Sequence, residues 1–131
     1  MKKALCVFSL ILSQPAFAMD DTQIESASVW LETIDAGKYE ESWYLTGTLF
    51  QDQLSATQWV EALVQVRQPL GELEDREVSS TTATDSLPGA PDGEYVVITY
   101  ATSFEHEDNT VETVTLRRQD EEWLPVGYFV R

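Results

Sequence analysis

The apolar residues in the first half of the chain recur at the spacing of amphipathic helices. A first helix is expected to begin at the capping-box sequence of residues 22–25 and to stop at residues 35–37, which end in glycine. Its apolar face consists of Ile24, Ala27, Leu31 and Ile34, and Trp30 widens that face. A short second helix is predicted around residues 39–46, with loose bounds because Gly47 follows.

A third helix is predicted from a second capping-box sequence at residues 55–58. Its apolar face consists of Trp59, Ala62, Leu63 and Val66. We expect it to end near Arg67, because Pro69 and Gly71 cannot continue a helix easily.

From residue 76 onward the apolar residues alternate with polar ones, and Val, Thr, Tyr and Phe become frequent, which favours strands. Strands are predicted over residues 77–84, 94–104, 109–118 and 122–130. Residues 87–93 form a loop rich in proline and glycine, and two short polar turns join the last three strands into a meander. Helices followed by strands predict an α+β domain, in which N-terminal helices pack on a curved antiparallel sheet of about four strands.

The predicted hairpins indicate which side chains share a face of the sheet. A first turn centred on Glu107 would pair Thr102 with Glu112 and Tyr100 with Val114. The carboxylate of Glu112 would then lie on an apolar sheet face.

A second turn centred on Asp120 would place Leu124, Val126 and Tyr128 on that same face. Glu112 would therefore lie between Thr102 and Tyr128. Because proline cannot donate a hydrogen bond to a neighbouring strand, Pro125 predicts a bulge or an unpaired edge.

The first eighteen residues have the three parts of a cleavable export signal. Lys2 and Lys3 precede an apolar run over residues 4–12, and alanine occupies positions 16 and 18. The run is shorter than the roughly 20 residues that cross a bilayer, so no stable membrane insertion is expected. A lipoprotein signal would need a cysteine at the cleavage point, whereas Cys6 lies near the start of the run. We expect cleavage after Ala18, a periplasmic location, and a single domain over residues 19–131.

The formal charge of the chain is −15, and loss of the two signal-sequence lysines makes it −17. Such a surface repels nucleic acid and anionic lipid, and it attracts cationic ligands or basic proteins. The expected mature chain has no cysteine, so its stability must come from packing rather than from disulfides.

Several short motifs occur together in this chain. The most specific are the Pro-Gly-Ala-Pro-Asp-Gly loop at residues 88–93 and Val126-Gly127-Tyr128; others include Ile34-Asp35-Ala36-Gly37 and Arg67-Gln68-Pro69-Leu70-Gly71. Across nearly all of the mature chain they resemble a bacterial family known only as domain of unknown function 4019, and this resemblance implies no particular activity. Three helices before a curved sheet also resemble the cone-shaped cystatin and nuclear-transport-factor-two-like folds. Those folds host isomerases, dehydratases, ligand binders and dimerisation modules, so the likeness does not fix a function.

Glu112 is the strongest candidate for a chemical role, because an inward carboxylate needs a cation or hydrogen bonds to offset its desolvation. Arg67 and Arg76 flank the turn that leads from helix to sheet, and either could supply the cation. We expect one of them to form a polar cluster with Glu112 and Tyr128. This cluster is either an ion pair that holds the sheet to the helices or a binding site, to which Tyr100 would add an aromatic wall.

His106, the single histidine, lies among acidic residues at an expected hairpin tip, where a solvated turn is favoured over a metal site or a general base. The sequence contains no recognisable nucleophile context, phosphate loop or metal-ligand spacing, so neither a cofactor nor a metal is expected. The loop of residues 87–94 could present a binding surface, although a simple connector is favoured.

Three classes of function fit these features. The first is an exported, non-catalytic module that binds a partner protein or small ligand through the cone face or the proline-glycine loop. The second is an acidic inhibitor or immunity-type protein that neutralises a basic partner in the envelope. The third is a small enzyme that uses a buried carboxylate for proton transfer. An exposed apolar sheet face would additionally suggest a homodimer.

Overall fold

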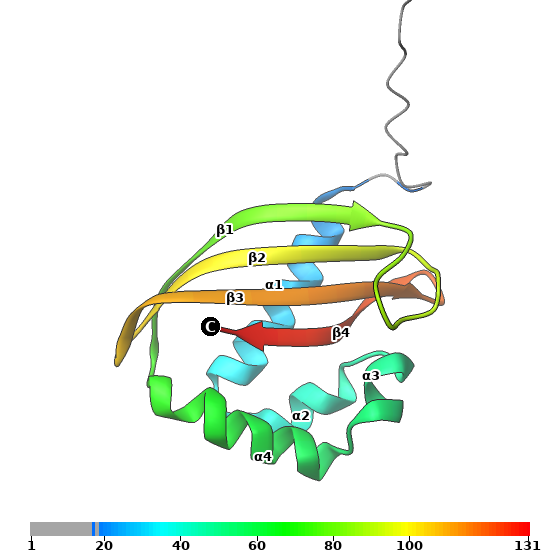
Figure 1. The fold of residues 1–131 in the computed structure, drawn as a ribbon. Coiled ribbons are helices and arrows are strands. Elements are labelled where there is room, and N and C mark those ends of the chain that lie inside the picture. Colours follow the sequence, from blue (N-terminus) through cyan, green and yellow to red (C-terminus); the bar gives the residue numbers. More distant parts are fainter. Residues whose placement is uncertain (1–16, 18) are drawn as a thin grey trace, which may run out of the picture.

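The computed structural model describes residue 17 and residues 19–131, and it shows helices packed on a curved antiparallel sheet (Figure 1). The predicted export signal lies outside the described residues, apart from Phe17. The helices are α1 (Asp21–Asp35), α2 (Tyr39–Tyr44), α3 (Thr48–Gln53), α4 (Ala56–Val66) and the 3-10 turn η1 (Gln68–Leu70). The strands are β1 (Leu73–Thr84), β2 (Tyr95–Phe104), β3 (Glu107–Gln119) and β4 (Glu122–Val130), and they neighbour one another in chain order. The predicted α+β class is confirmed, whereas the likeness to cone folds stays a prediction.

Capping boxes start both long helices, but one of them was misplaced by the sequence pattern. In α4 the prediction is confirmed, because Ser55 Oγ accepts from the Gln58 N–H at 3.1 Å and Gln58 Oε1 accepts from the Ser55 N–H at 2.9 Å. In α1 the cap is Asp20 rather than Thr22, and Gln23 Oε1 accepts from the Asp20 N–H at 3.0 Å. An Asp and a Gln at this spacing satisfy the free N–H groups as well as a Thr and a Glu do, which explains the shift.

The short helix predicted around residues 39–46 is confirmed as α2, whereas α3, which follows it, was not predicted. Gly47 separates them, and its N–H donates to the carbonyl of Pro125 in β4 at 2.9 Å. A Cβ at this position would lie 3.1 Å from Val126 Cγ1, so the absence of a side chain allows the backbone to approach the sheet. The break therefore depends on a contact that is distant in sequence.

The first hairpin has a tighter turn than predicted. Phe104 pairs with Glu107 across it, and Tyr100 rather than Thr102 lies opposite Glu112. The predicted pairs were therefore wrong by two residues. Because side chains alternate with a period of two, this slip keeps Glu112 on the inner face.

The second hairpin turns through Asp120 and Glu121, which both have positive φ, as expected of a two-residue turn. Leu116 pairs with Pro125, and a bulge follows before Val114 pairs with Tyr128. The bulge that Pro125 predicted is confirmed, and Tyr128 lies on the inner face.

The prediction for Leu124 was wrong. Trp123 and Pro125 are buried on the inner face instead, whereas Leu124 pairs with Arg117 and is only partly buried. The bulge restores the predicted face for Tyr128, and Val126 beside it packs against the core.

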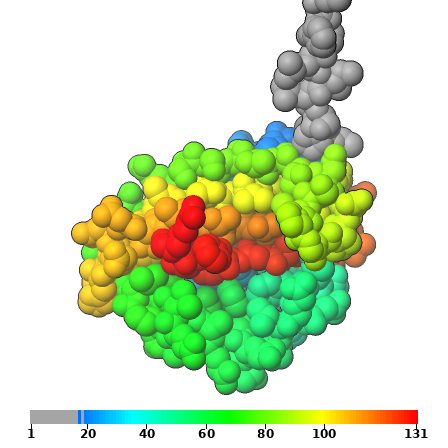
Figure 2. Space-filling model, viewed as in Figure 1, coloured from blue at the N-terminus to red at the C-terminus, as the bar shows by residue number. Residues whose placement is uncertain are grey.

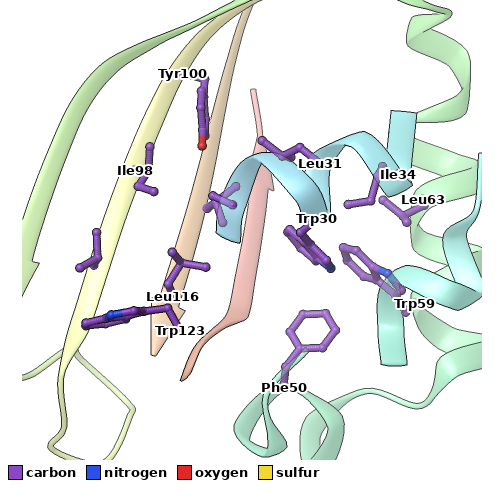
Figure 3. Close-up of a cluster of buried hydrophobic side chains, with 13 residues drawn as sticks. Trp30, Leu31, Ile34, Phe50, Trp59, Leu63, Ile98, Tyr100, Leu116 and Trp123 are labelled. Atoms are coloured by element: carbon purple, nitrogen blue, oxygen red, sulfur yellow. The ribbon is translucent and has the colours of Figure 1, made fainter. Parts of the chain in front are cut away.

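The core lies between the inner sheet face and the helices, with α1 against β3 and β4 and α3 against β4 (Figure 3). Trp30 stacks on Trp59 with ring centroids 5.8 Å apart. The Trp30 Nε1–H donates to the Ser42 carbonyl and the Trp59 Nε1–H to the Ser42 hydroxyl, both at 2.9 Å. These contacts join α1, α2 and α4, and they place most of the predicted apolar faces of the first and third predicted helices in the core.

The proline-glycine loop forms a ridge beside the sheet (Figure 2). Its backbone closes through a hydrogen bond from the Gly93 N–H to the Asp85 carbonyl at 3.0 Å. The Tyr95 hydroxyl donates to the Pro91 carbonyl at 2.5 Å. The loop prediction is confirmed, and the loop is anchored to the buried Tyr95.

Candidate functional site

The carboxylate of Glu112 is fully buried on β3 and receives hydrogen bonds from three side chains. The Thr102 hydroxyl donates to Oε1 at 2.7 Å, and Arg76 Nε donates to the same oxygen at 2.7 Å. The Tyr128 hydroxyl and Arg76 Nη2 donate to Oε2. The carboxylate is therefore compensated by both charge and hydrogen bonds, as a buried anion requires.

Arg76 links this carboxylate to helix α1. Its Nη1 donates to Asp35 Oδ2 at 2.7 Å and its Nη2 to Asp35 Oδ1 at 2.9 Å, while Nε faces Glu112. Burial opposes the charge on Arg76, but the hydrogen bonds that its guanidinium donates to Asp35 and Glu112, together with their negative charges, outweigh it and raise the pKa of the guanidinium. Arg76 therefore stays charged and connects β1, β3 and α1.

Arg67 belongs to the same network, but of the two candidate arginines it is Arg76 that pairs with Glu112. Arg67 is 3% exposed and reaches Asp35 at 3.3 Å, but its ion pair is not with Glu112. Its guanidinium also donates to the Gly71 carbonyl at 2.5 Å and lies 4.2 Å above the Phe104 ring. Arg67 thus fixes the turn between α4 and β1. We call the whole group the inner polar cluster; its members are Asp35, Arg67, Arg76, Thr102, Glu112 and Tyr128.

Asp35 was missed as a member of the cluster, since the sequence pattern assigned it only to the end of the first helix. One signal was present: a carboxylate in the last turn of a helix lies at the negative end of the helix dipole. Such a residue needs a cation, and here both Arg67 and Arg76 supply one. Pairing it with particular arginines required the tertiary structure.

Two tyrosines lie beside Glu112 in contrasting situations. Tyr128 donates its hydroxyl to the carboxylate, whereas the Tyr100 hydroxyl is buried and has no hydrogen-bond partner among the described residues. Tyr100 projects from β2 into the interior (Figure 3). Burial raises the pKa of Tyr100 to about 12, and burial together with the negative charge of Glu112 raises the pKa of Tyr128.

Replacing each tyrosine with phenylalanine should therefore have opposite effects on stability. Tyr128→Phe removes a hydrogen bond from a buried carboxylate and should lower the free energy of unfolding by about 1–3 kcal/mol. Tyr100→Phe removes an unpartnered hydroxyl and should leave that free energy unchanged or raise it by about 1 kcal/mol. Urea unfolding at pH 7 measures both, and equal losses in the two variants would contradict the contrast.

Stability should also decline at alkaline pH. The folded protein holds the Tyr100 proton more tightly than the unfolded chain, so this contribution is complete below pH 10 and is lost as the pH rises toward 12. Between pH 9 and pH 11.5 the loss from Tyr100 alone should be about 2 kcal/mol, with Tyr128 adding to it in the same direction. Urea unfolding at the two pH values tests this, and Tyr100→Phe should show the smaller decline.

His106 lies at the β2–β3 turn, as predicted. Its Nε2 is 3.6 Å from Glu105 Oε1, and more than half of each side chain is exposed. No three His, Cys, Asp or Glu side chains of the described residues come together as potential metal ligands. Among the residues that the structure describes, no helix is long and apolar enough to cross a membrane.

A separate open site lies between α1 and β4, where a groove of about 430 Å³ contains none of the inner polar cluster. Its lining includes the apolar residues Val29, Trp30, Leu45, Trp123, Leu124 and Pro125. A hollow of about 190 Å³ between α4 and β4 reaches Tyr128, but its lining does not include Glu112. Neither opening reaches the carboxylate. Whether Glu112, Tyr128, Arg67, Arg76 and Tyr100 bind a ligand stays a prediction.

These features define a small α+β domain with a largely buried polar cluster and a separate surface groove. Residues 26–128 match the family model described as "Protein of unknown function (DUF4019)", and the chain belongs to that family. No curated protein matches the sequence.

Proposed function

We propose that this protein is an exported, non-catalytic binding module of the cell envelope. The observation that carries the proposal is the environment of Glu112, whose two oxygens are fully buried and already accept hydrogen bonds from Arg76, Thr102 and Tyr128. A general base must reach the proton that it removes, and it needs a lone pair free to accept it. The cluster therefore supports the role of holding the sheet to the helices better than a role in proton transfer.

Export is supported by the order of charged, apolar and small residues over residues 1–18. Expression of the whole chain in a Gram-negative host, followed by N-terminal sequencing of the periplasmic fraction, tests this part. The expected N-terminus is Met19. Recovery of periplasmic protein that retains residues 1–18 would contradict it.

Binding is tested by comparing the mature protein with Glu112→Gln in capture of proteins from periplasmic extract, at a temperature where both are folded. The two proteins should retain the same partner, because the carboxylate faces the interior. If the protein were an enzyme that uses Glu112, the Glu112→Gln substitution would instead abolish a turnover that the unsubstituted protein shows. Failure of the mature protein to retain any partner or small ligand would contradict the binding proposal.

The acidic-inhibitor alternative has one observation of its own. The groove between α1 and β4 includes Glu25, Glu121 and Glu122 and no basic residue in its lining. Attraction between an acidic inhibitor and a basic partner would weaken strongly as salt is raised. Partner retention that falls at least tenfold between 50 mM and 500 mM NaCl would favour the inhibitor, and retention that hardly changes would favour an apolar recognition surface.

A further inference from the structure

The groove between α1 and β4 combines an apolar floor with an acidic rim. Val29 is 52% exposed and Leu45 is 40% exposed, whereas Trp123 and Pro125 of the same lining are buried. Trp123 lies beside Leu116 at one end of the core, so the groove floor is continuous with a fixed part of the interior (Figure 3). Because Trp123 is already packed, the protein has little ordering of this side chain to pay for when a ligand binds.

Trp123 of this groove is already covered on one side by an aromatic residue of the same chain. The Phe17 ring packs on Trp123 with centroids 5.2 Å apart and a tilt of 52°. A neighbouring hollow that contains Phe17 shares Thr22, Glu121 and Trp123 with the groove, so the two openings meet at Trp123. Cleavage after Ala18 would remove Phe17, uncover that side of Trp123 and extend the groove into the neighbouring hollow. Among the described residues that line that hollow, the one basic residue, Arg118, is paired with Glu94.

We infer that the groove of the mature protein binds a segment of a partner protein in which a large apolar side chain, above all an aromatic one, is next to Lys or Arg. This inference rests on the proposed function and names the partner chemistry. Phe17 shows that an aromatic side chain on a polypeptide fits against Trp123. Glu25, Glu121 and Glu122 supply the complementary charge for the basic neighbours.

Charge also argues against binding of a second copy of this chain in the groove. The mature protein carries a formal charge of −17, and the groove lining has three glutamates without a basic residue. Two such surfaces repel each other, which selects against self-association at this place. The same repulsion should weaken the binding of an acidic segment with the same aromatic residue.

The test uses mature protein, residues 19–131, and the blocked pentapeptide Gly-Lys-Phe-Lys-Gly. Its two control peptides replace Phe with Ala or both Lys with Glu. Peptide binding is followed by the nuclear magnetic resonance signals of the tryptophan indole N–H groups. We expect the Trp123 signal to shift with the Lys-Phe-Lys peptide, and both control peptides to bind at least tenfold more weakly.

Matched charge variants locate the site. Glu25→Lys with Glu122→Lys should weaken binding at least tenfold, whereas Glu74→Lys with Glu77→Lys, which makes the same charge change on exposed positions of β1, should alter it less than twofold. The full chain should bind more weakly than the mature protein, and Phe17→Ala in the full chain should restore the affinity.

Equal binding of the Phe and Ala peptides, equal loss in the two double variants, or no shift of the Trp123 signal would each overturn the inference. The proposed function would fail separately. If the mature protein retains a periplasmic partner with an affinity that Glu25→Lys with Glu122→Lys does not change, the binding proposal stands and the groove is not its site.

Discussion

Arg76→Met is expected to destabilise the protein by about 3–5 kcal/mol, because it leaves the fully buried carboxylate of Glu112 without its cation. Asp35 would still be paired with Arg67, so most of the lost stability comes from the unpaired charge of Glu112. For a domain of this size the melting temperature should drop by about 10–25 °C. Thermal and urea unfolding followed by circular dichroism measure the effect.

Two further variants separate a charge effect from lost packing. Arg76→Met combined with Glu112→Gln should be more stable than Arg76→Met alone, because the uncompensated charge is gone. Arg118→Met breaks the exposed ion pair with Glu94 and should cost less than about 1 kcal/mol. A double variant less stable than Arg76→Met would show that the buried charge is not the dominant cost.

Trp30→Ala should lower the free energy of unfolding by about 3–5 kcal/mol, since it opens a cavity at the junction of α1, α2, α4 and β4. The Trp30 side chain is 1% exposed, stacks on Trp59 and meets the Tyr128 ring edge-on at 5.7 Å. The substitution also removes the Nε1–H group that donates a hydrogen bond to the Ser42 carbonyl. Urea unfolding gives the loss directly.

The matched controls for this prediction are Tyr44→Ala and Trp30→Phe. Tyr44 is 64% exposed, so its removal should change stability by less than about 0.5 kcal/mol. Trp30→Phe keeps most of the packing and loses the hydrogen bond to Ser42, and it should fall between the other two. A loss from Trp30→Ala no greater than that from Tyr44→Ala would mean that the aromatic cluster does not organise the helices.

Part of the inner polar cluster could be predicted because strand periodicity tolerates certain errors. The predicted strand pairing of the first hairpin was wrong by two residues, yet Glu112 still faces the interior with Thr102 and Tyr100. A shift of two residues preserves the face of every side chain. The second hairpin required the Pro125 bulge to bring Tyr128 to the same face, and the missing N–H of proline gave the signal for it.

Contacts between residues far apart in the sequence could not be predicted from local periodicity. The choice between Arg67 and Arg76 as the partner of Glu112 depends on where β1 and α4 lie, and Asp35 joins both arginines from the end of a third element. The division of α2 from α3 likewise depends on the approach of Gly47 to Pro125, 78 residues further along the chain. These contacts are set by packing, which local propensity does not encode.

By itself, the sequence determined the α+β class, the strand order of a meander, the capping of α4, the aromatic core and the inward position of one carboxylate. Each follows from local periodicity, turn chemistry or the area that large apolar side chains must bury. Only the tertiary structure decided that Glu112 is closed off by Arg76, Thr102 and Tyr128, and that an acidic groove opens at Trp123. Both depend on the spatial meeting of elements far apart in the chain.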